Sequence, residues 1–314
     1  MFTHTPLRLT TLALLAIGSL AYAFAAGFFG LEILAEIAIL AILVIALDLV
    51  AGFGGMVSLC HGALLGVGAY AFTVAANDAG LTALPAMALA VALSTVLAFA
   101  IGAVCARSTG IYFIMATLAF GQMAYSFVFQ SPLFGGDDGL SGAPRPDLTA
   151  LGIDLTDSRA FAVYAILLVA LAYRVAAATL RSGLGRCLVG LHHNEKRLRA
   201  LGLTVWRAKA TAFAISGALA GLAGCLAAQH TQYISPGLLS WTVSGEALVV
   251  VILGGLGTLV GPILGAILFV VLFFTLRALS PAGVAVLPGG ASVARDGLAG
   301  LGAWRRGERS VLWA

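Results

Sequence analysis

Long stretches without a single charged residue limit the folds that this chain can adopt. A helix needs about 20 apolar residues to cross roughly 30 Å of hydrocarbon. Six uncharged stretches are long enough: residues 9–31, 49–77, 79–106, 108–136, 210–245 and 247–276. Charged residues are only 10% of the chain, too few to cover the surface of a water-soluble protein. The uniform apolar runs also lack the alternation of a membrane β-barrel. We therefore expect an all-α polytopic membrane protein.

Apolar length predicts a bundle of about eight or nine transmembrane helices. The predicted helices are residues 9–29, 31–50, 53–76, 81–106, 111–130, 159–180, 210–229, 243–259 and 262–279. The segments that begin at Phe53 and Val243 are rich in glycine. Either can be a broken or re-entrant helix, which membranes tolerate where the backbone is buried in protein or lines a cavity. The first segment also fits a signal peptide that ends near Ala23-Phe24-Ala25, although its apolar length favours a helix.

The loops differ in charge, and the positive-inside rule then orients the chain. Residues 174–209 hold eight basic residues and one acid, whereas residues 131–158 hold five aspartates and one arginine. One predicted helix separates the two loops. We therefore expect the N-terminus and residues 181–209 in the cytoplasm and residues 131–158 outside. The same count leaves the basic residues of the C-terminal tail outside, which conflicts with the rule.

Residues 181–202 have the pattern of an amphipathic helix on the membrane surface. The apolar stripe consists of residues at three- and four-residue steps or their sums: Leu184, Leu188, Leu191, Leu198 and Leu201. Gly190 can divide this helix, and Glu195 falls within the stripe. Such a helix can lie among lipid headgroups or dock into a groove on a partner protein. A carboxylate in the stripe disfavours anionic lipid.

Four stretches of the chain carry a family resemblance. They read GGMVSLCHGALLGVGAY at 54–70, GIYFIMATLAFGQ at 110–122 followed by GGDDGL at 135–140, the segment 185–202 with its continuation at 212–224, and GGLGTLVGPILGA at 254–266. In this order they resemble the bacterial branched-chain amino-acid ABC transporter permeases, of the LivM type in the LivH/LivM family. The resemblance covers residues 50–280.

The resemblance implies a permease subunit of an ABC importer that moves branched-chain, hydrophobic amino acids inward through a bacterial inner membrane. It implies a second permease subunit of the LivH type, two cytoplasmic ATPase subunits and a periplasmic substrate-binding protein as partners, with no nucleic acid. It also implies that residues 181–209 contain a coupling helix that sits in a groove of the ATPase. The coupling residues are then Gly185, Arg186, Leu188, Leu191, Asn194, Glu195, Leu198 and Gly202.

The chain is not expected to be an enzyme. A P-loop requires Gly-x-x-x-x-Gly-Lys-Ser/Thr, and neither lysine, Lys196 or Lys209, lies in such a motif. We therefore expect ATP and Mg²⁺ to bind a separate ATPase subunit and no cofactor to bind this chain. The histidines lack carboxylates at ligand or triad spacing, and the cysteines lack metal or redox spacing. No catalytic or metal-binding residue is predicted.

Polar residues within apolar segments are candidates for a translocation path. These candidates are Ser58, His61, Tyr112, Gln122 and Tyr125. His61 is the strongest because neighbouring glycines leave space beside it, although each candidate can instead form hydrogen bonds between helices. Glycines four residues apart let helices approach closely. The pairs Gly62–Gly66, Gly217–Gly221 and Gly261–Gly265 are therefore predicted to serve helix packing.

We expect residues 1–280 to form the transmembrane permease domain and residues 281–314 to form an atypical tail rich in Gly, Ala and Arg. The family usually ends with a further apolar helix, so a disturbed reading frame near Ser280 is one hypothesis. Two other functions stay open. One is a urea or short-amide permease of the same family. The other is a secondary transporter that works alone, for which Asp48 and Glu246 give thin support.

Overall fold

The computed structural model describes residues 6–146, 155 and 157–279, and this part of the chain is almost entirely helical. Its α-helices are α1 (Pro6–Ala25), α2 (Phe28–Ala51), α3 (His61–Asn77), α4 (Ala83–Cys105), α5 (Ile111–Gln130), α6 (Ser158–Arg181), α7 (Gly183–Ala200), α8 (Val205–Thr231), α9 (Trp241–Gly254) and α10 (Gly261–Leu279). Short 3₁₀-helices, η1 (Pro132–Phe134), η2 (Gly136–Asp138) and η4 (Pro236–Leu239), join some of them. The predicted all-α fold is confirmed.

Five described helices are long and apolar enough to cross a membrane, and they make this chain a multi-pass membrane protein. They are α2, α4, α5, α6 and α8. The apolar helices α9 and Leu14–Ala25 are shorter. The 14 residues of α9 rise only about 21 Å, less than the hydrocarbon thickness. The helix ends at Gly254, before Gly255 with its φ of 99°, so the predicted segment 243–259 is a broken helix, one of the forms expected of it.

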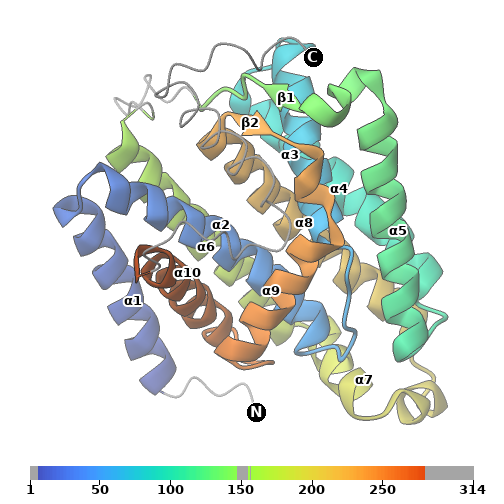
Figure 1. The fold of residues 1–314 in the computed structure, drawn as a ribbon. Coiled ribbons are helices and arrows are strands. Elements are labelled where there is room, and N and C mark those ends of the chain that lie inside the picture. The colour runs from blue at the N-terminus through green and yellow to red at the C-terminus, as the bar shows by residue number, and fades with distance from the viewer. Residues whose placement is uncertain (1–5, 147–154, 156, 280–314) are drawn as a thin grey trace. The chain divides into compact units, whose positions relative to one another are not determined.

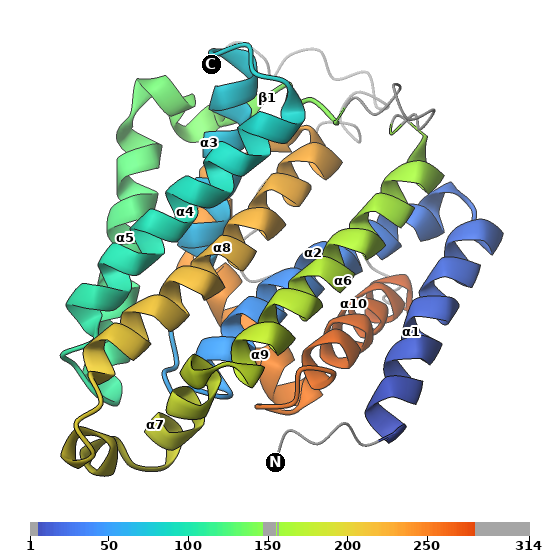
Figure 2. The same cartoon turned by 180° about the vertical axis from the view of Figure 1, so that it is seen from behind.

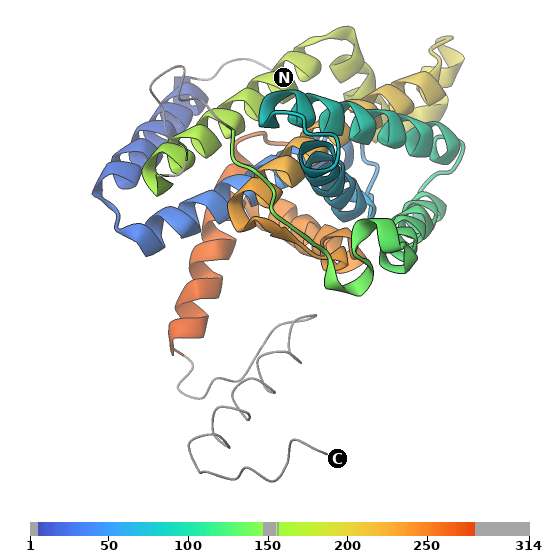
Figure 3. The same ribbon diagram turned by 90° about the horizontal axis from the view of Figure 1, so that it is seen from above.

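The chain divides into two units, Met1–Val270 and Val271–Ala314, and the fold described here is that of the first unit. Its centre is α8, which packs against α2, α3 and α4 (Figure 2). Seen from above, α4 runs beside α8 (Figure 3). Small residues allow this close packing: a Cβ added at Gly221 would lie 2.6 Å from Ser94 Cβ on α4, and one added at Gly68 would lie 2.5 Å from Gly221 O.

The segment between α2 and α3 is not helical, so the predicted helix 53–76 is wrong over residues 53–60. Gly55 has a φ of 67°, which favours glycine and ends helical geometry. Four residues of this segment are nevertheless buried: Phe53, Met56, Ser58 and Cys60. Side chains satisfy part of the segment's backbone, since Leu59 N–H donates to Thr117 Oγ1 at 3.2 Å. Irregular backbone at membrane depth is tolerated in this way, as expected for a broken helix.

The basic segment and the acidic loop lie at opposite ends of the first unit (Figure 1). Helix α7 lies at one end, the same end at which α1 begins. The other end carries η2 and a two-stranded antiparallel sheet of β1 (Leu140–Ser141) and β2 (Tyr233–Ile234). This separation agrees with the predicted placement of the two loops on opposite sides. The predicted tail 281–314 and the frame hypothesis at Ser280 fall outside the described residues.

Candidate coupling loop and translocation face

Helix α7 consists of two helical pieces that meet at Asn194. Asn194 has φ −162° and ψ 98°, far from helical values. Its side-chain Oδ1 accepts a hydrogen bond from Arg197 N–H at 3.1 Å, as an N-cap residue does. The break expected at Gly190 is therefore wrong in position. The helix is interrupted by the capping side chain of Asn194 and not by a glycine, which has no side chain.

Three of the five stripe leucines of α7 pack against the chain itself, whereas Leu184 is half-buried and Leu201 is 71% exposed. Leu188 is fully buried, and Leu191 and Leu198 are 7% and 9% exposed. Gly185 is also buried, close to Leu180 O. Contacts with α6 and α8 bury these three leucines, so they do not face lipid headgroups, and their part in coupling to a partner stays a prediction. Three other candidate coupling residues are exposed: Arg186, Asn194 and Gly202.

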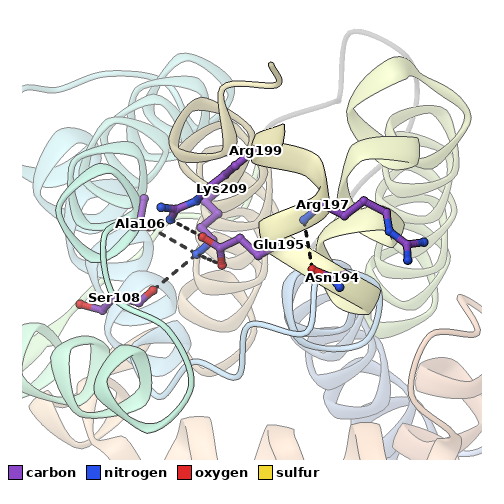
Figure 4. A network of polar contacts seen from close by, with 7 residues as sticks. All are labelled: Ala106, Ser108, Asn194, Glu195, Arg197, Arg199 and Lys209. Carbon is purple, nitrogen blue, oxygen red and sulfur yellow. Dashed lines mark hydrogen bonds and ion pairs between the residues drawn. The ribbon is translucent and has the colours of Figure 1, made fainter. Parts of the chain in front are cut away.

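Glu195 connects α7 to the start of α8 and to the turn after α4 (Figure 4). Its carboxylate accepts hydrogen bonds from Arg199 on the same helix and from Lys209 Nζ at 2.9 Å. Lys209 is only 3% exposed and also donates to the carbonyl oxygens of Ala106 and Ser108, at 3.3 and 3.4 Å. The buried ammonium group of Lys209 thus holds together the second piece of α7, the start of α8 and the turn after α4.

Burial and hydrogen bonding act in opposite directions on Glu195. Partial burial raises the pKa of its carboxyl, but hydrogen bonds and charges from Lys209 and Arg199 lower it further, so the net pKa is below the usual range. Glu195 is therefore ionised at neutral pH. Its charge neutralises buried Lys209 of the same chain. The sequence pattern predicted only that Glu195 lies in the apolar stripe, not that it pairs with this lysine.

A second set of contacts joins α7 to the turn between α9 and α10. A Cβ added at Gly55 would lie 2.8 Å from His192 Nδ1, so the turn after α2 lies directly on α7. At the end of α2, buried Asp48 Oδ1 accepts a hydrogen bond from Gly257 N–H at 2.8 Å. Residues of α7, the turn after α2 and the turn after α9 therefore form one continuous packed region.

Two of the predicted path residues, Ser58 and His61, are completely buried between helices. His61 Nε2 lies 2.7 Å from Ser216 Oγ on α8, and Nδ1 lies 3.1 Å from Ser58 Oγ. The Ser216 hydroxyl donates to Ala46 O on α2 at 2.5 Å. His61 Nε2 therefore donates to Ser216, because the hydroxyl's single hydrogen is already used. The network links α2, α3 and α8.

The other three candidates, Tyr112, Gln122 and Tyr125, belong to α5, whose outer face is largely open. Only 22% of the most apolar 18-residue part of α5 is buried. Tyr112 is 72% exposed, and the Tyr125 ring stacks on Phe129 with centroids 5.7 Å apart. Gln122 lines a hollow of about 450 Å³ on this face. The structure therefore separates the five candidates into a buried pair and three residues of α5, of which Tyr112 is exposed and Gln122 and Tyr125 are half-buried.

The hollow on α5 combines polar and apolar side chains. Gln122, Ser126 and Gln130 line it at four-residue steps, beside Ala119, Met123 and Phe127. Helix α5 contacts α9, where Glu246 is exposed. Amide and carboxylate side chains that face hydrocarbon are costly, so such residues in membrane segments normally face protein or water. The α5 face therefore suits a water-filled path or a subunit contact.

The six predicted packing glycines all lie at close approaches. A Cβ at Gly62 would lie 2.8 Å from Ser240 O, and one at Gly265 would lie 2.5 Å from Val250 O. The other glycines would also meet neighbouring atoms: Gly66 meets Leu239, Gly217 meets Ala98, Gly221 meets Ser94, and Gly261 meets Gly254. Larger side chains at these positions would push helices apart.

The sequence model of the family described as branched-chain amino acid transport system / permease component matches residues 29–287. The chain belongs to this permease family. The high-affinity branched-chain amino acid transport system permease protein LivM of Escherichia coli (strain K12) is 34% identical over 195 residues, which cover 55% of this chain and 46% of LivM. LivM of Salmonella typhimurium (strain LT2) matches with the same figures. The alignment thus spans about half the length of each relative. No solved structure matches the chain.

Membership makes this permease a component of a transport system, in agreement with the predicted family. Sequence reasoning missed two of its central polar residues, Lys209 and Ser216. Lys209 counted only as one charge of the basic loop, although it directly precedes the apolar run of α8. That position was the available signal, because a lysine at the start of a membrane helix needs a partner or water. Nothing in the sequence pointed to Ser216.

Proposed function

We propose that this permease is the LivM-type membrane subunit of an ABC importer for branched-chain amino acids. The support is its family, the branched-chain amino acid transport named for the LivM relatives and the amphipathic hollow on α5. The hollow is the single observation that carries the substrate path. It offers amides and a hydroxyl for the ammonium and carboxylate of an amino acid, and Met123 and Phe127 for its apolar side chain.

The open face of α5 also supports the proposed assembly. A second permease subunit of the LivH type would cover Gln122 and its neighbours and close the path between the two chains. Two cytoplasmic ATPase subunits, which bind ATP and Mg²⁺, and a periplasmic binding protein complete the importer. The N-terminus and residues 181–209 lie on the cytoplasmic side of the bacterial inner membrane in this proposal.

The coupling loop works through both of its faces in this proposal. Exposed Arg186 and Asn194 and the turn at Gly202 contact the ATPase, while buried Leu188 and Leu191 pass its movement to α6 and α8. The turn after α2 lies against His192, so the movement also reaches Asp48 and Gly257. ATP-driven closure of the ATPases then switches the opening of the path from one side to the other.

The substrate is tested by uptake of labelled leucine, and separately of urea, in cells with and without this gene. Leucine uptake that depends on the gene and on ATP is expected. Uptake of urea alone would favour the amide permease, and leucine uptake without an ATPase would favour a secondary transporter that works alone.

The path is tested by Gln122→Leu, with Met115→Leu as the matched control. Met115 is 61% exposed on the same helix but does not line the hollow. We expect Gln122→Leu to reduce leucine uptake about tenfold, since a binding site that loses a hydrogen-bonding group loses about this much affinity. Equal amounts of both variants in the membrane are required. Equal uptake by the two variants would contradict the proposed path.

A further inference from the structure

A second hollow, of about 810 Å³, lies at the α7 end of the first unit between the end of α4 and the start of α8. Arg107 follows α4, Arg199 projects from α7, and Trp206 belongs to the first turn of α8. Val104 and Leu203 provide apolar walls. The proposed substrate path does not use this hollow, and neither the family nor the relatives assign it a ligand.

The two ends of this hollow differ in chemistry. Arg107 and Arg199 are exposed guanidinium groups, and no acidic residue is among the described residues that line it. The nearest carboxylate, Glu195, already accepts from both Arg199 and Lys209. Arg207 adds a third cation beside the hollow and stacks over the Trp206 ring at 5.5 Å. This end attracts anions.

The apolar lining of the hollow adjoins the ends of two helices that are long and apolar enough to cross a membrane. Helices α4 and α8 are both membrane-span candidates, and the hollow lies where α4 ends and α8 begins. Val104 is 61% exposed, Leu203 46% and Trp206 48%. Exposed tryptophan at the end of a membrane helix is typical of the layer of lipid headgroups. Apolar walls thus meet cationic groups at the depth where a phospholipid changes from acyl chain to phosphate.

We propose that this hollow binds an anionic phospholipid. Its phosphate lies between Arg107 and Arg199, its glycerol region lies on Trp206, and its acyl chains follow Val104 and Leu203. Basic pockets between membrane helices commonly hold such headgroups. An acidic segment of a protein would match the arginines but leave the exposed apolar walls without a partner.

The site also touches the joint that holds α7. Lys209 donates to Ala106 O and Ser108 O, which flank Arg107 on either side. Arg199 belongs to both the hollow and the Glu195 ion pair. A bound lipid therefore adds a second link between the turn after α4 and the end of α7, and it stabilises their arrangement.

The test uses the full-length chain purified in detergent and titrated with phosphatidylglycerol or with phosphatidylcholine, with bound lipid counted by native mass spectrometry. We expect a clear preference for phosphatidylglycerol and a higher melting temperature in its presence. The double variant Arg107→Gln/Arg199→Gln should bind phosphatidylglycerol about tenfold more weakly, because each arginine near a membrane surface contributes to anionic lipid binding.

The matched control, Lys196→Gln/Arg197→Gln, removes the same charge from exposed positions of α7 outside the hollow, and it should bind like the parent. In Figure 4 the Arg197 side chain points away from Lys209. Arg107→Lys/Arg199→Lys should restore most of the binding. Equal affinity of the parent for both lipids, or an equal loss in the control, would overturn the proposal. If Arg107→Gln/Arg199→Gln binds lipid like the parent but no longer co-purifies with the ATPase, the proposal is also overturned, in favour of a protein occupant.

Discussion

Lys209 Nζ lies 2.9 Å from Glu195 Oε2, and this ion pair fixes the end of α7 to the first turns of α8. The lysine is the inner partner, with 3% of its side chain exposed against 19% for the glutamate. The pair also reaches the turn after α4 through Ala106 O and Ser108 O. The only lysine in the described apolar core is therefore neutralised by the only acid of the coupling loop.

Replacement of Glu195 should destabilise this joint. Glu195→Gln leaves a buried ammonium without its counter-charge, and we expect a loss of about 1–3 kcal/mol, between the values for exposed and buried pairs. Glu195→Lys should cost more and should also abolish ATPase co-purification while the protein stays in the membrane. Melting temperatures measure the first effect. Lys196→Gln, at the exposed neighbouring position, is the control and should melt like the parent. An unchanged melting temperature of Glu195→Gln would refute the structural role of the pair.

The same ion pair should make stability depend on pH in the acid range. The pKa of Glu195 in the folded chain is below its ordinary value of 4.5, so folding favours the ionised form. This contribution is complete above pH 4.5 and is lost as the pH falls through the lower, folded pKa. Melting temperatures of the parent and Glu195→Gln should therefore converge as the pH falls below 4.5. A difference that stays constant down to pH 3 would contradict this.

The network around His61 should matter for stability more than for substrate recognition. Ser216→Ala removes the acceptor of His61 Nε2 and a second donor to Ala46 O, and it leaves the buried His61 Nε2–H without a partner. We expect a loss of about 1–3 kcal/mol in stability. Thr211→Val is the control on the same helix, because the Thr211 hydroxyl bonds only to carbonyls of α8 itself. If Ser216→Ala melts like the parent but transports poorly, His61 belongs to the path instead.

The contact between α8 and α4 should not tolerate a methyl group at Gly221. A Cβ there would lie 2.6 Å from both Ser94 Cβ and Ser94 Oγ. We expect Gly221→Ala to cost about 1–3 kcal/mol through overpacking. Gly245→Ala on α9 meets no atom within 4 Å, so it should be neutral or slightly stabilising, as alanine favours a helix. Comparison of the two melting temperatures measures the effect, and equal values would show that α4 and α8 can separate without cost.

The positions of the long helices were predictable because apolar length acts locally. The predicted helices 111–130 and 159–180 match α5 and α6 within a residue or two. The two Gly-rich segments are broken as expected, but their predicted bounds were wrong, because glycine spacing alone does not fix where a helix breaks. The chain leaves helical geometry at Gly55 and Gly255, both with positive φ, and both turns lie beside the end of α2. Their conformation depends on Asp48, His192 and Gly257, which come from distant parts of the sequence.

The sequence predicted which residues belong to the candidate site, but it did not predict how they are arranged in space. The basic loop, its glutamate and the polar residues of α5 were all identified. The sequence could not separate buried His61 from half-buried Gln122, since both are polar residues in equally apolar segments. Burial depends on which neighbours pack there, and Ser216, the partner of His61, is 155 positions away.

The sequence by itself determined the class of this protein, its family and the segregation of its charges. An apolar run of 20 residues must form a helix in a membrane whatever its neighbours are, because lipid offers its backbone no hydrogen bonds. Only the tertiary structure decided the rest. It buried three leucines of the α7 stripe, paired Glu195 with Lys209 and left α5 open, because those outcomes depend on distances between side chains that the sequence keeps far apart.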